Sequence, residues 1–267
     1  MKAFSSVILL LENRKERMKH TSAFFLLLVL LLSAGAGASA QTYSGERKFD
    51  GVHRNEISGN LMWGFNVVTG TVIGEAATYT RHLTDRWSIS AGEQVQFIKW
   101  LYSVDLMGTY RLPLRHSNLY FDGRVVNNLY TQWDMQELLI NASAFWEASH
   151  FDLRLGMSYI HYYKYKIKED YQFFTDAGYT EPPTITFGVG ANLMPRSSRW
   201  NLGLFLRNYD QFYYENWNIN WGLRFHTTLP WNEMKLFGEF NVRPAGSLSQ
   251  LATRYETALK LGIKYVW

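Results

Sequence analysis

The sequence contains no cysteine, and proline is scarce, with six residues among 267. Without cysteine the chain can form no disulfide, no thiolate metal site and no lipid anchor on an amino-terminal cysteine, which excludes a lipoprotein. Long apolar runs are also missing, because the longest one, Ala23–Leu32, is about half of the roughly twenty residues that a membrane-spanning helix needs. The mean hydropathy of −0.22 likewise argues against a bundle of apolar helices.

The chain also lacks a strong charge of either sign. The formal net charge is +4, but the first forty residues hold five basic and two acidic residues, which leaves 22 basic and 21 acidic residues in the remainder. The basic isoelectric point is therefore no argument for nucleic-acid binding.

The amino-terminal forty residues have the three parts of a secretory signal peptide. A short basic stretch follows Met18, the apolar run Ala23–Leu32 comes next, and Ala38-Ser39-Ala40 provides small residues for cleavage. We predict translation from Met18, cleavage after Ala40 and a mature chain that begins at Gln41. The expected organisation is therefore a start-site extension plus cleaved signal peptide over 1–40, a polar periplasmic lead over 41–56 and one domain over 57–267.

Aromatic residues are abundant, at 16% of the chain, and the last thirteen residues show how they are placed. Alternate positions from Tyr255 to Trp267 are apolar or aromatic, and the positions between them are mostly polar or small. Since successive side chains of a strand point to opposite faces, this pattern predicts a strand with one apolar face. A terminal tryptophan on such a strand is typical of a membrane interface.

This carboxy-terminal strand resembles the assembly signal of bacterial outer-membrane β-barrels. The resemblance rests on the spacing of Lys260, Gly262, Tyr265 and Trp267, and it is to the class rather than to one family. It implies a Gram-negative outer membrane, contact with outer-membrane lipid and lipopolysaccharide, and recognition by the barrel-assembly machinery.

The same alternation recurs along the whole domain and predicts an all-β fold, a single antiparallel up-and-down transmembrane barrel of about twelve strands. Met135–Leu139 has helical composition, but its neighbours on both sides favour a strand. Short connections after even strands and longer ones after odd strands, such as Lys166–Pro183, predict that both termini are periplasmic. The predicted strands cover residues 57–67, 71–82, 87–97, 100–112, 119–127, 138–146, 151–165, 185–193, 200–206, 217–229, 236–242 and 255–267.

Parity along the predicted strands places a set of charged residues in the lumen: Arg154, Arg207, Arg224, Glu239, Glu256 and Lys260. Hairpin pairing should bring Arg224 near Glu239, with Lys260 alongside. These residues could form a constriction that selects solutes. They could equally form ion pairs that only keep the lumen satisfied, an interpretation that we slightly favour. Inward aromatic residues predict a partly filled lumen: Phe145, Tyr162, Phe205, Tyr209 and Phe237.

Glu93 does not fit the pattern, because it shares the lipid-facing side of its strand with Trp87, Ile89 and Phe97. A carboxylate toward lipid costs about 2 kcal/mol or less. A β-bulge that turns Glu93 inward is the simplest explanation. The alternative is a subunit interface, since the neighbouring strand is predicted to present only small residues outward, from Val72 to Thr80.

The favoured function is a narrow porin-like channel for small solutes, with no cofactor and no metal. The first alternative is an outer-membrane lipid or lipopolysaccharide hydrolase, and the second is a structural or adhesive barrel that acts through its loops. Arg115-His116-Ser117 is interpreted as a polar turn, because adjacent His and Ser side chains point to opposite faces. His226 and Thr228 share a face, and His226 is interpreted as a satisfied lumen residue. No catalytic or metal-binding residue is therefore assigned.

Overall fold

A computed structural model describes residues 55–66, 70–97, 101–131, 135–164, 179–180, 182–209, 219–229, 234–242 and 257–267. These residues all belong to one compact unit, Ser39–Trp267. The predicted signal peptide, most of the polar lead and most of the segment Lys166–Pro183 lie outside the described residues. Within the described ranges there is no helix that is long and apolar enough to cross a membrane.

The described residues form strands almost throughout, and each predicted strand is present. The segment with helical composition is a strand, β6, because it pairs along its whole length with both neighbours. The strands are β1 Asn55–Asn66, β2 Gly70–His82, β3 Trp87–Gln96, β4 Leu101–Pro113, β5 Ser117–Tyr130, β6 Met135–Ala148, β7 Phe151–Lys164, β8 Tyr179–Thr180, β9 Thr184–Asn192, β10 Trp200–Arg207, β11 Asn220–Thr228, β12 Met234–Val242 and β13 Thr257–Val266.

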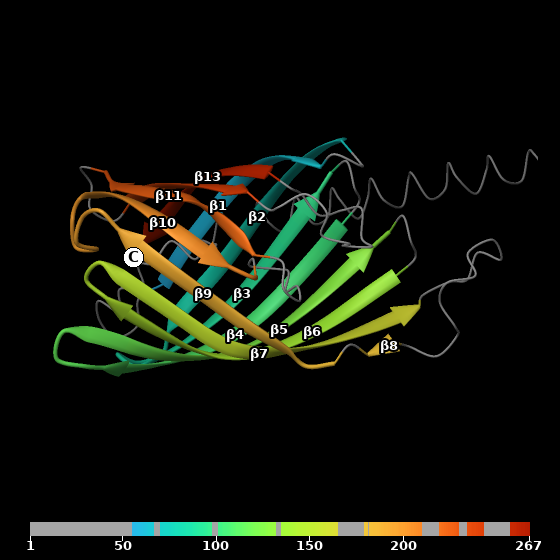
Figure 1. Ribbon diagram of the computed structural model, residues 1–267, viewed down its shortest axis with the longest axis horizontal. Coiled ribbons are helices and arrows are strands. Elements are labelled where there is room, and N and C mark those ends of the chain that lie inside the picture. Colours follow the sequence, from blue (N-terminus) through green and yellow to red (C-terminus); the bar gives the residue numbers. More distant parts are fainter. Residues whose placement is uncertain are drawn as a thin grey trace, which may run out of the picture. The chain divides into compact units, whose positions relative to one another are not determined.

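The strands form one closed antiparallel barrel of twelve long strands, as predicted (Figure 1). Each long strand pairs with the long strands before and after it in the chain, and β1 pairs with β13 to close the wall. The additional strand β8 is two residues long and pairs only with His161 and Tyr162 of β7. Closure leaves no long strand with an unpaired edge, which a strand inside a lipid bilayer requires.

Alternation along each strand separates two surfaces. The outer surface is apolar, as Leu61, Trp63 and Leu155 show with exposed fractions of 67%, 65% and 61%. The inner surface is polar and buried, with serine, threonine, asparagine and charged residues at the intervening positions. An apolar exterior around a polar interior is the arrangement of a barrel that spans a membrane.

The second strand faces the opposite way from the prediction. Val72, Ala76, Thr78 and Thr80 are buried in the lumen, because the pairing with β1 places Tyr79 beside the outward-facing Ile57. The outward face of β2 mixes Ile73 and Tyr79 with the charged residues Glu75 and Arg81, and the inward face carries small residues. Neither face is clearly the apolar one, so the alternation in the sequence cannot distinguish them.

The seam between β1 and β13 holds the chain's last residues. Trp267 and Asn55 exchange backbone hydrogen bonds of 2.8 and 3.0 Å, and the rings of Tyr265 and Trp267 stack with centroids 5.6 Å apart. Gly262 lies opposite Asn60 in this seam, and the ring of Phe237 packs against it on the lumen side. A side chain at position 262 would collide with that ring and with the backbone of β1.

We expect Gly262→Leu to impair barrel assembly strongly, because the added side chain would push β1 and Phe237 away from β13. Deletion of Trp267 should have the same effect through loss of the last hydrogen-bonded pair of the seam. The measurement is the fraction of membrane-inserted protein that keeps its folded mobility in detergent without heating. Gly108→Leu is the matched control, since a side chain there meets open space. If Gly262→Leu assembled as well as Gly108→Leu, the seam would not limit assembly.

Candidate functional site in the barrel lumen

The lumen contains opposite charges in almost equal numbers. Among the described residues, seven acidic side chains and six arginine or lysine side chains are buried inside the barrel. Because an unpaired buried charge is costly, such charges are expected to be paired. The acidic residues are Glu56, Asp105, Asp122, Glu137, Glu147, Asp152 and Glu239, and the basic ones are Arg124, Arg154, Arg196, Arg207, Arg224 and Lys260.

Glu239 lies where the sequence predicted, with Arg224 beside it on β11 and Lys260 beside it on β13. Its closest ion pair is nevertheless with Arg207 of β10, at 2.6 Å, whereas the Lys260 ammonium is 3.9 Å away. Arg207 also donates a 3.2 Å hydrogen bond to Asn241. The guanidinium of Arg224 turns in the opposite direction and binds Asp152. Pairing between strands therefore predicted the neighbours but not the ion-pair partners.

A second group of ion pairs lies on the β4–β7 side of the lumen. The Arg154 guanidinium is 3.5 Å from Asp122, which also accepts a 2.8 Å hydrogen bond from Thr109. The neighbouring Arg124 lies 3.2 Å from Asp105. Both arginines are almost completely buried, at 1% and 2% exposed. Such buried pairs fix the positions of the side chains that fill the barrel.

Tyr209, immediately after β10, lies between the two groups. The Arg154 and Arg207 guanidinium carbons lie 5.0 and 5.7 Å from the centre of its ring, within the range of cation–π interactions. The ring packs against Gly188, where a side chain would overlap it. The predicted inward residues Phe145, Phe205 and Phe237 are also buried, and so these rings take up part of the lumen.

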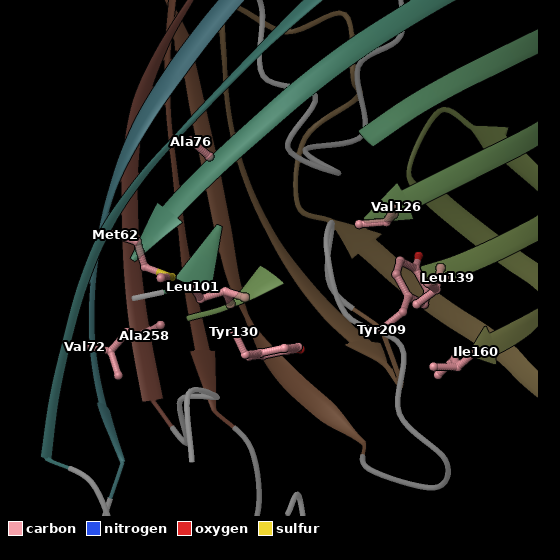
Figure 2. Close-up of a cluster of buried hydrophobic side chains, with 10 residues drawn as sticks. All are labelled: Met62, Val72, Ala76, Leu101, Val126, Tyr130, Leu139, Ile160, Tyr209 and Ala258. Carbon is pink, nitrogen blue, oxygen red and sulfur yellow. The ribbon is translucent and has the colours of Figure 1, made fainter. Parts of the chain in front are cut away.

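An apolar layer lines the half of the barrel away from Trp267. Its members come from strands on both sides of the barrel, and all face inward (Figure 2). The lumen is therefore not uniformly polar, because these buried side chains form an apolar cluster inside it. The layer comprises Met62, Val72, Ala76, Leu101, Val126, Tyr130, Leu139, Ile160, Tyr209 and Ala258.

Glu93 faces outward, and the pairing of β3 with β2 and β4 is continuous on both sides of it. The predicted bulge is therefore absent, because each residue of β3 has one partner on each neighbouring strand. Glu75 of β2 also faces outward, and it lies opposite Val95, the next outward-facing residue of β3 after Glu93. Within the described part of the chain, neither carboxylate accepts a hydrogen bond or forms an ion pair. The subunit-interface interpretation of Glu93 stays a prediction.

The histidine candidates lie in a turn, in the lumen wall and on the outer face. His116 is exposed in the turn before β5, where Ser117 begins the strand. His226 is partly buried in the lumen wall near Arg224, and His161 lies on the outer face against Tyr163. Glu256 lies outside the described residues. Across the described ranges, no three His, Asp or Glu side chains are grouped so that they could hold a metal ion.

Sequence reasoning missed Asp152 and Arg196 in the lumen. Asp152 is the second residue of β7, and its inward position follows from the parity of the inward-facing Arg154. Arg196 belongs to a turn, where strand parity does not apply, so no sequence signal placed it inside.

We expect Arg207→Ala to lower the free energy of unfolding by about 3 kcal/mol, because the buried Glu239 carboxylate would lose its close ion pair with the Arg207 guanidinium. The double variant Arg207→Ala/Glu239→Gln should recover most of this loss, since it removes the uncompensated charge as well. Urea unfolding in detergent, followed by tryptophan fluorescence, measures both values. Equal stability of the two variants would show that burial of the charge is not the dominant cost.

The comparisons with known proteins bear on the fold. No protein-family model matches the chain, and no curated protein matches its sequence. An outer-membrane channel from Pseudomonas putida F1 is similar in structure, with a TM-score of 0.52 and 10% identity over 86% of this chain and 100% of that one. The KdgM porin and Omp33 of Acinetobacter baumannii, each 10% identical, give TM-scores of 0.48 and 0.45 over 79% and 80% of this chain and 98% of each of theirs. The chain therefore has the fold of outer-membrane β-barrel proteins.

Proposed function

We propose that the chain is a narrow porin-like channel for small solutes in the bacterial outer membrane, with both termini in the periplasm. The observation that carries the proposal is the polar inner surface of a closed barrel whose outer surface is apolar. A barrel with no role in passage could fill its interior with apolar residues at no cost in unsatisfied polar groups. Buried polar and charged side chains here follow the wall from Glu56 to Lys260.

Large side chains occupy the lumen and contact residues beyond the adjacent strand. Arg154 contacts Asp122 two strands away, and Arg207 contacts Glu239 two strands away in the other direction. A twelve-stranded barrel lies between the filled small barrels and the wide porins, so small movements of these side chains decide whether a passage exists. A passage between these side chains would admit only small solutes.

The rival functions receive no support from a specific observation. A hydrolase would need a nucleophile and a base on the same face, but His116 and Ser117 are adjacent residues at a strand end. An adhesive function would depend on loops such as Lys166–Pro183, most of which lie outside the described residues. The apolar exterior would contact outer-membrane lipid and lipopolysaccharide, and the strand that ends at Trp267 would be recognised by the barrel-assembly machinery.

Single-channel recording in planar bilayers tests the proposal. The parent should show small conductance steps, and Tyr209→Ala should raise the conductance roughly twofold, because it removes the ring between Arg154 and Arg207. Tyr163→Ala, which removes an outward-facing ring, is the matched control and should leave the conductance unchanged. Absence of conductance from both the parent and Tyr209→Ala would reject the channel function.

The near balance of buried charge predicts weak ion selectivity. Under a tenfold gradient of potassium chloride, the reversal potential of the parent should lie near zero, because neither ion meets a lumen of opposite net charge. Glu239→Gln should shift the selectivity toward anions, since it leaves Arg207 and Lys260 without their carboxylate. A strongly cation-selective or anion-selective parent would contradict the balance that the buried residues show.

A further inference from the structure

Two arginines from distant parts of the chain converge on one carboxylate oxygen near the Trp267 end of the lumen. The Oδ2 atom of Asp152 accepts hydrogen bonds from the guanidinium groups of both Arg196 and Arg224. Asp152 is 7% exposed, and both arginines are buried. Two guanidinium groups directed at one oxygen form the kind of site that binds a carboxylate.

Arg224 reaches this oxygen across two intervening strands. It lies on β11, whereas Asp152 lies on β7, and β9 and β10 separate them in the wall. The inward positions beneath its path are glycines, Gly190 and Gly203, and a side chain at either position would overlap the arginine. The wall is therefore shaped so that this guanidinium can lie flat along it.

Arg196 reaches the same oxygen from the turn between β9 and β10. Its Nε donates a 2.9 Å hydrogen bond to the carbonyl oxygen of Ala148, and its Nη1 lies 3.4 Å from Glu147. Its backbone nitrogen also donates to the carbonyl oxygen of Ser149, at 3.0 Å. Arg199 in the same turn is exposed. Arg196 therefore points into the lumen, whereas Arg199 of the same turn does not.

A small cavity lies beside the two arginines. Its volume is about 10 Å³, and Asn192, Arg196, Asn201, Arg224 and His226 are among the residues that line it. The Oδ1 atom of Asn192 accepts a 3.3 Å hydrogen bond from Arg224, which leaves its Nδ2 group as a donor. That buried Nδ2 has no hydrogen-bond partner among the described residues.

The groups that line this cavity determine which kind of ligand atom could bind in it. No carboxylate belongs to it within the described residues, so its groups are mainly donors and cations. A cavity of this size has room for one water-sized group, such as a single oxygen atom. An oxygen atom in this cavity would lie beside both arginines and could accept a hydrogen bond from Asn192.

We propose that Arg196, Arg224 and Asn192 form a binding subsite for the carboxylate group of a small organic anion, and that the carboxylate of Asp152 occupies this subsite when no solute is bound. An entering carboxylate would replace Asp152 on one or both arginines, so that each guanidinium keeps a carboxylate partner. The role of the subsite in passage rests on the proposed channel function, whereas the binding itself does not.

Chemical rescue of Asp152→Ala by acetate tests the subsite. The variant removes the internal carboxylate and leaves two arginines with space beside them, so its melting temperature in detergent should fall. Sodium acetate should then raise this temperature by about 3 °C more than sodium chloride at equal concentration, because acetate binds only the folded state. Acetate should stabilise the parent less than it stabilises Asp152→Ala, since in the parent it must compete with the Asp152 carboxylate for the arginines.

The double variant Asp152→Ala/Arg224→Gln is the control, because it lacks one of the two guanidinium groups and should show no preference for acetate. If Asp152→Ala folds poorly, the yield of refolded protein in acetate against chloride serves as the same readout. Equal effects of acetate and chloride on Asp152→Ala, or rescue that survives in the double variant, would overturn the proposed subsite. Rescue by acetate in a protein that shows no conductance would reject the channel function and retain the subsite.

Discussion

Hydrogen bonding between neighbouring strands constrains everything else in this protein. Inside lipid, each backbone donor and acceptor of a strand needs a partner in the wall, and only a closed barrel supplies partners for all of them. Closure in turn fixes which residues face lipid and which face the lumen, because side chains alternate strictly along a paired strand. The outward position of Glu93 illustrates the strength of this constraint, since continuous pairing holds the carboxylate on the apolar side.

The same constraint explains the composition of the lumen. Large charged side chains project inward from many strands, and their charges must be neutralised within a small enclosed space. Arginine suits this task, because its guanidinium can bind two acceptors and also lie over an aromatic ring, as Arg207 does with Glu239, Asn241 and Phe205. Glycine residues on the inner wall leave the space in which these large side chains lie. Gly188 accommodates Tyr209, and Gly190 and Gly203 accommodate Arg224, so these inward glycines mark where large side chains lie across the sheet.

Alternation in the sequence predicted the fold class, the twelve strands and most lumen residues, because the pattern depends on two different environments on the two sides of one wall. It failed for β2, where the outward face mixes Ile73 and Tyr79 with Glu75 and Arg81, and only the pairing with β1 decides the direction. It also failed for partners that are not on adjacent strands. The Arg224–Asp152 pair depends on side-chain length and on the glycines between them, and Arg196 enters from a turn. The periodicity of strands contains no information about either.

The seam between β1 and β13 has a consequence for the order in which the barrel folds. The first strand of the described barrel, β1, pairs with β13, so the wall cannot close until β13 has been synthesised. Until then β1 and the growing end of the sheet each present an unpaired edge, the kind of edge that promotes aggregation. Contacts between the two ends of a chain also form slowly, because a long loop must close first. Aggregation is therefore most favourable in the interval after β1 has been synthesised and before it pairs with β13.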